Sequence, residues 1–319
     1  MKYSGIGGQA VLEGVMMRNR DKYAVAVRKP DGKIAVDVDE FKGPAHGQRV
    51  RRIPFLRGIF VFIDSLALGL RAINLSASYF DEEEGGGESK KSDPSGRGED
   101  AATLLVTVLS FAIAIAVFTL LPYFLASLFK RLIPSDGIIA VIEGIMRIVI
   151  FVAYILLISL MKDIRRLFAY HGAEHKCINC IESGMPLTVQ NAQKATRLHR
   201  RCGSSFLLFV MLVSIVLFFF IRADSLLLRL LLRILLIPVI AGISYELIRL
   251  AGRTDFFLIR ALSAPGLWLQ RLTTREPDDD MLEVGIAAVE AVFDWRQYLS
   301  DAFGLQISDA EIATDPYDD

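Results

Sequence analysis

AATLLVTVLSFAIAIAVFTLLPYFLASLF, residues 101–129, contains no charged side chain. A helix needs about 20 apolar residues to cross the hydrocarbon core of a bilayer, so this stretch predicts a transmembrane helix. Three further apolar segments cover residues 138–161, 203–221 and 225–245. The chain has 319 residues and 53% of them are hydrophobic, which is too apolar for an ordinary soluble domain. We therefore expect a mainly α, polytopic membrane protein with about four transmembrane helices.

Basic residues indicate the orientation of these helices, because Lys and Arg near the ends of spans stay in the cytoplasm. The segment 162–202 carries three acidic side chains and eight basic ones: Lys162, Arg165, Arg166, Lys176, Lys194, Arg197, Arg200 and Arg201. The N-terminal residues lack the apolar core of a signal peptide. Both termini and the segment 162–202 are therefore expected in the cytoplasm, where cysteines are kept as thiols.

The region before the first span, residues 1–50, is expected to be cytoplasmic and rich in β-structure. The runs QAVLEGVMM, YAVAVRK and KIAVDVDEF have strand character, and a Pro30-Asp31-Gly32 turn joins the last two. They predict a three-stranded antiparallel meander over residues 9–40. Residues 51–80 predict an amphipathic helix that lies in the membrane interface and does not cross it. Residues 81–100 are polar and rich in glycine, and they predict a disordered linker.

The remaining chain is divided by its apolar segments. Two transmembrane hairpins are expected over residues 101–161 and 203–250, with a cytoplasmic loop over 162–202 between them. Residues 251–319 are expected to form a cytoplasmic, amphipathic C-terminal region. Its helical periodicity is interrupted at Ala264-Pro265-Gly266, which predicts a break in the first helix of this region.

Several charged side chains lie inside the predicted spans. Glu143 and Arg147 are four residues apart on one helix face, so they predict an ion pair. Arg229 and Arg233 share a face near the outer end of the fourth span, and we expect them to extend outward to the interface. Glu246 lies at the cytoplasmic end of that span, where it is a candidate carboxylate ligand for a site in the central loop.

Histidine and cysteine are concentrated in one short segment. The chain has four histidines and three cysteines, and six of these seven residues lie between positions 171 and 202: His171, His175, Cys177, Cys180, His199 and Cys202. Metal binding is the commonest cause of mixed clusters of this kind. We expect a divalent metal here, with zinc as the first choice.

The spacing is compatible with an open, catalytic metal site. A helix over residues 163–176 would place His171 and His175 one turn apart on the same face. Together with Glu174 they have the order H-x-x-E-H, which is the inverse of the H-E-x-x-H motif of zinc proteases. With these two histidines and either His199 or Cys202 as ligands, a fourth position stays open and Glu174 acts as the general base.

The same residues are also compatible with a closed, structural site. Cys177 and Cys180 form a C-x-x-C motif, and His199 and Cys202 form an H-x-x-C motif at the other end of the loop. Closed tetrahedral zinc sites commonly take two ligands from each end of a loop. Glu174 would then only support a ligand. A redox-active dithiol is a third interpretation, although nothing else in the sequence is typical of a thioredoxin-like fold.

Five motifs in the same order resemble a known family. They are GGQAVLEGVMMR (7–18), IPFLRG (53–58), YHGAEHKCINC (170–180), RCGSSFL (201–207) and SAPGLWLQRLTTREPDDDMLEV (263–284), and they are similar to the YqhQ-like bacterial membrane protein family. The resemblance implies a protein of the bacterial cell membrane and a predicted metal-dependent enzyme of unknown function. The family pattern is matched here by His171, Glu174, His175, Cys180, His199 and Cys202. Family members often have threonine at the position of Cys177, which makes this thiol a weaker candidate. They commonly have proline at the position of Arg200, a departure that affects the shape of the loop more than its ligands.

Two hypotheses of different class follow. The first is an integral membrane protein with a cytoplasm-facing His/Cys/Glu metal site that acts as a metal-dependent hydrolase on lipid or protein at the membrane surface. The second is a non-enzymatic membrane scaffold or membrane-protein biogenesis factor with a structural zinc site. A transporter has less support, because no span carries a clear series of polar residues near its middle. The expected partners are the lipid bilayer and either other membrane proteins or a second copy of the chain, and no nucleic acid is expected.

Overall fold

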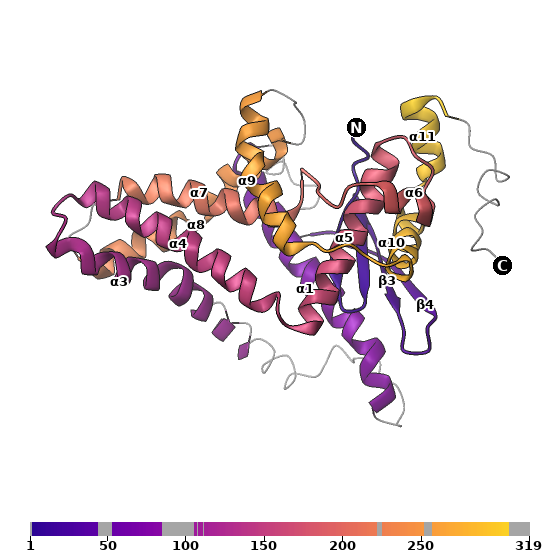
Figure 1. The fold of residues 1–319 in the computed structure, drawn as a ribbon, viewed down its shortest axis with the longest axis horizontal. Helices are drawn as coiled ribbons and strands as arrows, with labels where there is room; N and C mark the ends of the chain where they lie inside the picture. Colours follow the sequence, from indigo (N-terminus) through magenta and orange to yellow (C-terminus); the bar gives the residue numbers. More distant parts are fainter. Residues whose placement is uncertain are drawn as a thin grey trace. The chain divides into compact units, whose positions relative to one another are not determined.

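A computed structural model divides the chain into two compact units (Figure 1). The structure describes residues 2–43, 53–84, 105–106, 108–110, 112–221, 225–251 and 257–305. The first unit combines Met1–Glu84, Ser159–Phe209 and Ala241–Asp319, and the second combines Gly85–Ile158 with Val210–Ile240. Of the linker predicted over 81–100, residues 81–84 continue a helix and the rest lies outside the described residues.

The N-terminal region folds as an antiparallel sheet of four strands in sequence order: β1 (Gly7–Val11), β2 (Gly14–Asn19), β3 (Lys22–Arg28) and β4 (Ile34–Glu40). The meander is confirmed, but it has one strand more than expected because QAVLEGVMM folds back on itself. Val11 pairs with Gly14 across a turn in which Glu13 has a φ of +48°. A Cβ at Gly14 would lie 2.2 Å from the carbonyl oxygen of Ala26, so only glycine fits beside this turn.

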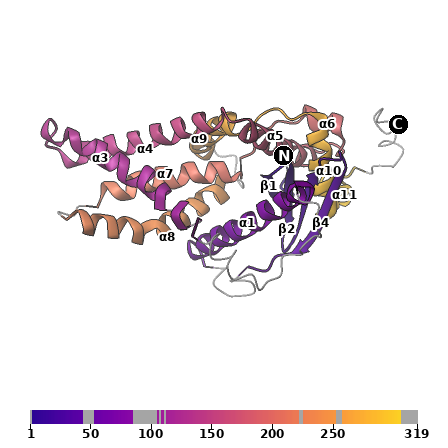
Figure 2. The same cartoon turned by 90° about the horizontal axis from the view of Figure 1, so that it is seen from below.

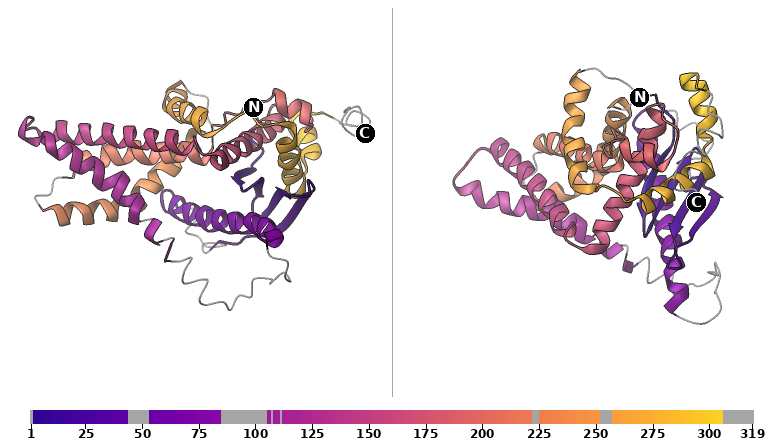
Figure 3. Two further views of the ribbon diagram at one scale, coloured as in Figure 1. Left: turned by 60° about the horizontal axis from the view of Figure 1, so that its bottom comes forward. Right: turned by 45° about the vertical axis from the view of Figure 1, so that its right-hand side comes forward.

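The two faces of the sheet pack against different helices, because successive side chains of a strand alternate between faces. These helices are α1 (Leu56–Glu84), α5 (Lys162–Glu182) and α10 (Asp279–Val292). The face that carries Met17 forms one buried core with α5 and α10, and the face that carries Met16 forms another with Leu68 of α1. Figure 2 and the left view of Figure 3 show α1 on one side of the sheet and α10 on the other.

Helix α5 is longer than the expected 163–176, and this changes the position of the C-x-x-C motif. It continues to Glu182 and ends before Gly184, which has a φ of +83°. Cys180 follows His171 by nine residues, which is about two and a half turns of a helix. The two side chains therefore lie on opposite sides of α5.

Three more helices complete the first unit: α6 (Val189–Lys194), α9 (Phe257–Thr273) and α11 (Trp295–Phe303). The break expected at Ala264-Pro265-Gly266 is wrong, since α9 runs through Pro265. A proline removes a single helix hydrogen bond, and the helix is retained here while Leu269 and Gln270 are buried in its following turn. Gly266 lies at a close approach, because a Cβ there would be 2.8 Å from Oγ of Ser205.

Within the part of the chain that the structure describes, four helices are long and apolar enough to cross a membrane: Leu56–Phe80, Val108–Arg131, Gly137–Ile158 and Leu231–Ala251. The expectation of a multi-pass membrane protein with about four such helices is confirmed. Their identities differ from those expected. α7 (Gly203–Phe219) has 17 residues and is about 26 Å long, which is slightly less than a bilayer core. The segment that we expected in the interface, now part of α1, meets the length and composition that a crossing requires.

The second unit contains a buried cluster of charges on α4 (Asp136–Ile158) and α8 (Leu226–Ala251). Arg147 lies 2.8 Å from one oxygen of Glu143, which confirms the expected ion pair. Arg233 lies 2.8 Å from the other oxygen and is only 5% exposed. The expectation that Arg233 extends outward is therefore wrong, because the buried carboxylate attracts it inward. The side chain of Arg229 lies outside the described residues.

Candidate metal centre

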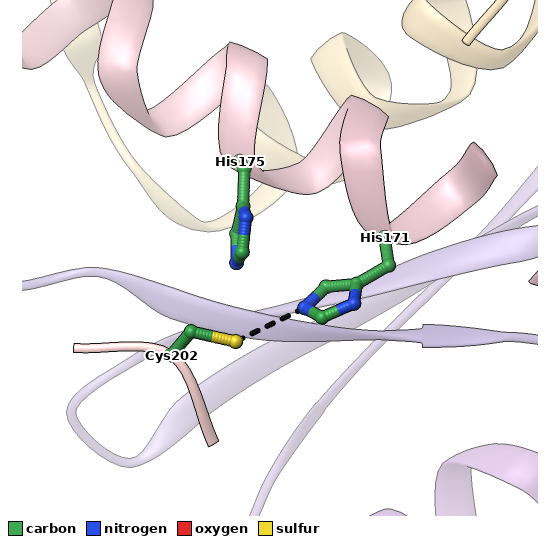
Figure 4. Close-up of side chains that lie close together, drawn as sticks. All are labelled: His171, His175 and Cys202. Atoms are coloured by element: carbon green, nitrogen blue, oxygen red, sulfur yellow. Dashed lines mark hydrogen bonds between the residues drawn. The ribbon is translucent and has the colours of Figure 1, made fainter. Parts of the chain in front are cut away.

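Three potential metal ligands of the first unit converge at one point (Figure 4). His171 and His175 come from successive turns of α5, and Cys202 comes from the loop before α7. One ligand atom of each residue lies within 4.8 Å of the other two. The centroids of the two imidazole rings are 4.4 Å apart. Of the six histidines and cysteines clustered between positions 171 and 202, these three form a group that could hold a metal ion.

Backbone carbonyls orient both imidazoles. Nδ1 of His171 lies 2.8 Å from the carbonyl oxygen of Thr273, and Nδ1 of His175 lies 2.6 Å from that of Arg197. A carbonyl oxygen only accepts, so each Nδ1 donates its proton and Nε2 is the nitrogen that each ring can offer to a metal. Histidines that bind a metal are commonly held in this way by a hydrogen bond from their other nitrogen.

The two Nε2 atoms lack ordinary partners. Nε2 of His175 is buried and has no hydrogen-bond partner among the described residues. Nε2 of His171 lies 3.1 Å from Sγ of Cys202. A buried polar atom without a partner costs about 1–3 kcal/mol, and a cation bound between these atoms would remove that cost. Two neutral imidazoles and one thiolate form a donor set that suits zinc.

The local electrostatics favour a thiolate at Cys202. Burial acts to raise the pKa of this thiol, but the charges of His171 and His175 and the hydrogen bond with His171 lower the pKa well below its usual value. Burial acts to lower the pKa of His171, and the neighbouring Cys202 thiolate raises that pKa to about 9. A proton on Nε2 of His171 and a divalent cation would compete for the same lone pair, so metal binding at this group would release a proton.

His171 and Cys202 line a cavity of about 820 Å³, and Glu174 lines it as well. The side chain of Glu174 is buried, and burial raises its pKa while the charges of His175 and His171 act to lower it. A rise in pKa makes a carboxylate a stronger proton acceptor. A Cβ at Gly8 would lie 2.4 Å from the carbonyl oxygen of Met16 and 3.2 Å from Cγ of Glu174, so glycine lets β1 approach this carboxyl group.

Two buried amide side chains fasten the loop that carries Cys202. Asn179 donates to the carbonyl oxygens of Thr196 at 2.6 Å and Leu198 at 3.1 Å. Gln270 accepts from the amide of His199 and donates to its carbonyl oxygen, both at 2.8 Å. Neither residue was predicted from the sequence. The position of Asn179, one helical turn after His175 on α5, could have indicated a role beside this histidine. Gln270 is 71 positions from His199, and no local sequence pattern links the two residues.

The segment after α9 crosses α5 at Gly172. A Cβ there would lie 2.0 Å from the carbonyl oxygen of Arg275, so the crossing requires glycine. The amide of Arg275 donates to the carbonyl oxygen of Phe168 at 2.8 Å. These contacts hold the preceding Thr273 carbonyl against His171.

Both cysteines of the C-x-x-C motif lie in the apolar core and outside the His/Cys group. Sγ of Cys180 lies 3.3 Å from the carbonyl oxygen of Pro186, and burial raises the pKa of Cys180 to about 12. Burial also raises the pKa of Cys177, whose sulfur packs against Gly285 of α10. Both groups are therefore held as neutral thiols, which are poor metal ligands.

His199 and Glu246 have other partners. Nε2 of His199 lies 3.7 Å from the carboxylate of Glu182 and 3.1 Å from a guanidinium nitrogen of Arg201, while its ring centroid is 5.5 Å from that of His175. Glu246 accepts from Arg57 of α1 at 2.6 Å. The structure brings neither residue into the group formed by His171, His175 and Cys202.

Comparisons with known proteins agree with the motifs. Residues 53–295 match a family described as "Protein of unknown function (DUF1385)". The "Uncharacterized protein YqhQ" of Bacillus subtilis (strain 168) is 41% identical over 290 residues, which cover 88% of this chain and 89% of that protein. No solved structure matches the chain. The chain therefore belongs to the YqhQ-like family of membrane proteins, the DUF1385 family, whose function is unknown.

Proposed function

We propose that the protein is a metal-dependent hydrolase of the bacterial cell membrane, with a cytoplasm-facing site formed by His171, His175 and Cys202. One observation carries the proposal. The Nε2 atoms of two imidazoles and one thiolate converge beside a large cavity, and Nε2 of His175 is buried without a partner among the described residues. Three protein ligands beside a cavity leave a coordination position for water or substrate, which is typical of catalytic zinc sites.

Glu174 is the proposed general base. A divalent ion held by the three ligands would act as a Lewis acid toward a carbonyl or phosphoryl oxygen. Glu174 lines the same cavity, and burial raises the pKa of its carboxyl group, which is the direction that favours a proton acceptor. It would take the proton of the attacking water and return it to the leaving group.

A purely structural metal has less support, because the loop is already held without one. Asn179 and Gln270 fasten its backbone through four hydrogen bonds to the residues before Cys202. The core position of Cys180 also argues against a closed site that would use the C-x-x-C motif.

The contacts of α5 with the sheet support a position of both on the same side of the membrane. Both belong to the first unit and pack together, so they lie on the same side and an even number of crossings separates them. Residues 108–131 and 137–158 supply two crossings, and a crossing by α1 would make the number odd. We therefore infer that α1 lies along the interface. Its Leu68 packs on the sheet, whereas Ile63 and Leu70 are exposed and available to lipid.

The proposal is tested by the metal content and turnover of the Glu174→Gln variant. Purified wild-type protein should contain about one zinc per chain and release products from a total membrane extract, detected by mass spectrometry. Glu174→Gln should keep the zinc and slow product release by about 10²–10⁴-fold, the usual contribution of a general base. Asp301→Asn, which changes an exposed carboxylate on α11, is the control and should behave as the wild type. Wild-type turnover by Glu174→Gln, or freshly purified protein without any bound metal, would contradict the proposal.

A further inference from the structure

Helix α9 has a buried face that holds the surroundings of the His/Cys group. Gln270 on this face binds the backbone of His199 through two hydrogen bonds and donates to Oγ of Ser205 at 2.8 Å. The carbonyl oxygen of Thr273 accepts from Nδ1 of His171 at 2.8 Å. The buried face of α9 therefore supports both the loop that follows α6 and one of the proposed ligands.

The opposite face of α9 is exposed and carries Ala264, Pro265, Trp268 and Arg271, which we call the outer face. Spacings of three and four residues place Ala264, Trp268 and Arg271 on one side of the helix. Trp268 is 52% exposed, although a tryptophan side chain is largely apolar. A tryptophan and an arginine on one exposed helix face are typical of helices at a membrane–water interface.

The position of α9 along the chain and in the first unit places it at the end of two apolar helices. It packs on the first turn of α7, where a Cβ at Gly266 would lie 2.8 Å from Oγ of Ser205. It also begins at Phe257, five residues after α8 ends at Ala251. Five residues reach at most about 18 Å, which is less than the roughly 30 Å of a bilayer core. α9 therefore lies on the side of the membrane where α8 ends.

The composition of α9 suits the bilayer interface. Its 17 residues include Arg260 and Arg271 and no acidic residue, and the cytoplasmic leaflet of a membrane is partly anionic. Arginine can keep its carbon chain in apolar surroundings while its charge reaches the headgroups. A stable protein interface takes about 20–30 residues from each side, whereas the outer face has four. The bilayer is therefore a better occupant of the outer face than a protein.

We propose that the outer face of α9 lies in the cytoplasmic interface of the bilayer, and that this contact holds the buried face of α9 against the loop of the His/Cys group. The exposed residues and the neighbouring apolar helices support the position in the bilayer independently of any metal. The effect on the loop rests on the proposed function, because it is measured through the bound metal.

The chain has two tryptophans, and they allow a direct test. Trp268 is on the outer face, whereas Trp295 is 1% exposed in the core of the first unit. Full-length wild type and Trp268→Phe are reconstituted in phosphatidylcholine nanodiscs, and the difference between their emission spectra belongs to Trp268. Trp295→Phe, which retains only Trp268, gives the same emission without subtraction.

A nitroxide attached near the headgroup end of a lipid acyl chain should quench most of the emission of Trp268. A nitroxide near the methyl end should quench it less, because interfacial helices lie only about 5–10 Å deep. Neither lipid should change the emission of Trp295, which is measured in Trp268→Phe.

Trp268→Glu tests the link to the loop, since a carboxylate on the outer face disfavours contact with apolar lipid. Competition with a chelator in nanodiscs should show zinc affinity about tenfold below that of the wild type, the lower end of the effect of losing groups that orient a ligand. Val38→Glu is the matched control, because Val38 is 48% exposed on β4 and the same charge is introduced away from α9. It should retain wild-type affinity.

Each alternative outcome has a defined meaning. Quenching of Trp268 by iodide in the water, without quenching by the nitroxide lipids, would place the outer face in solvent and overturn the inference. Emission that neither quencher changes would mean that protein covers Trp268, and it would also overturn the bilayer assignment.

The two parts of the proposal are separated by combining the measurements. Lipid quenching with unchanged zinc affinity in Trp268→Glu would support the position in the bilayer and overturn the link to the loop. Wild-type protein without zinc would contradict the proposed function, whereas lipid quenching in the same sample would still support the position of α9.

Discussion

The charged cluster of the second unit and the His/Cys group of the first differ in how their polar atoms are satisfied. Glu143 uses one carboxylate oxygen for Arg147 and the other for Arg233, so opposite charges are in contact. The guanidinium of Arg233 also lies over the rings of Tyr123 and Phe218, at 5.3 and 4.8 Å from their centroids. In the His/Cys group, three electron-pair donors face one another and none of them carries a permanent positive charge.

This difference separates a structural cluster from a candidate site. Opposite charges that are buried in contact compensate each other and need no further component, whereas removal of one partner leaves an uncompensated buried charge. Donors that converge in a buried position repel or compete for a proton unless a cation is added. We therefore expect substitutions in the charged cluster of the second unit to change stability alone, and substitutions in the His/Cys group to change metal binding.

The largest expected effect is the loss of metal from His175→Ala. This change removes one of three ligands, and bound zinc should fall from about one per chain to background. His199→Ala is the matched control, because this histidine packs beside His175 but its Nε2 faces Glu182 and Arg201. Inductively coupled plasma mass spectrometry on both purified variants makes the comparison. If His199→Ala lost as much metal as His175→Ala, His199 would have to be counted among the metal ligands, which would contradict the proposed set of three.

The next effect concerns stability. Glu143→Gln leaves two buried arginines without a counter-charge and should destabilise the protein by about 3–5 kcal/mol. Unfolding in mixed micelles measures this change, and zinc content of the protein that remains folded should equal that of the wild type. If zinc were lost in step with the removal of Glu143, the two clusters would not be independent as proposed.

A smaller effect is expected at Asn179. Asn179→Ala removes the two hydrogen bonds that hold Thr196 and Leu198, on either side of the carbonyl that orients His175. Zinc affinity should fall by about 10–100-fold, as is typical when groups that orient a ligand are removed. Competition with a fluorescent chelator gives the affinity. Asn191→Ala, at the start of α6, is the control for the general effect of removing an amide side chain, and it should retain wild-type zinc affinity.

The smallest effect is a dependence of stability on pH through Glu182. Burial acts to raise the pKa of this carboxyl group, but His199, Arg201 and Ser4 lower the pKa to about 2 from its ordinary 4.5. A depressed pKa in the folded state means that the contribution of Glu182 is present above about pH 4.5 and is lost as the pH falls toward 2. Metal-free wild type should therefore lose more stability across this window than metal-free Glu182→Gln. Identical pH profiles would contradict the role of Glu182 in holding the loop at Arg201.

The sequence was informative where the interaction is local. The spacing of His171 and His175 was enough to place both on one face of a helix, and Glu143 with Arg147 formed the expected pair. The apolar segments indicated a multi-pass membrane protein. The two residues of each pair are four positions apart, about one helical turn, and each apolar segment is continuous in the sequence.

Interactions between distant segments could not be predicted in this way. Cys177 and Cys180 were candidate ligands because of their C-x-x-C spacing, but α5 continues to Glu182 and both side chains lie in the apolar core. Arg233 is drawn inward by a carboxylate 90 residues earlier. The carbonyl of Thr273 that orients His171 comes from a segment 102 residues away, and no local pattern marks it.

The central claim is that two histidines and a single cysteine hold a metal and leave one position open. Zinc K-edge X-ray absorption on the purified protein counts the ligands directly, since zinc lies at about 2.3 Å from sulfur and about 2.0–2.1 Å from nitrogen. We predict one sulfur, two imidazole nitrogens and one additional light atom from solvent. Two or more sulfur ligands, or no zinc at the edge, would contradict the account.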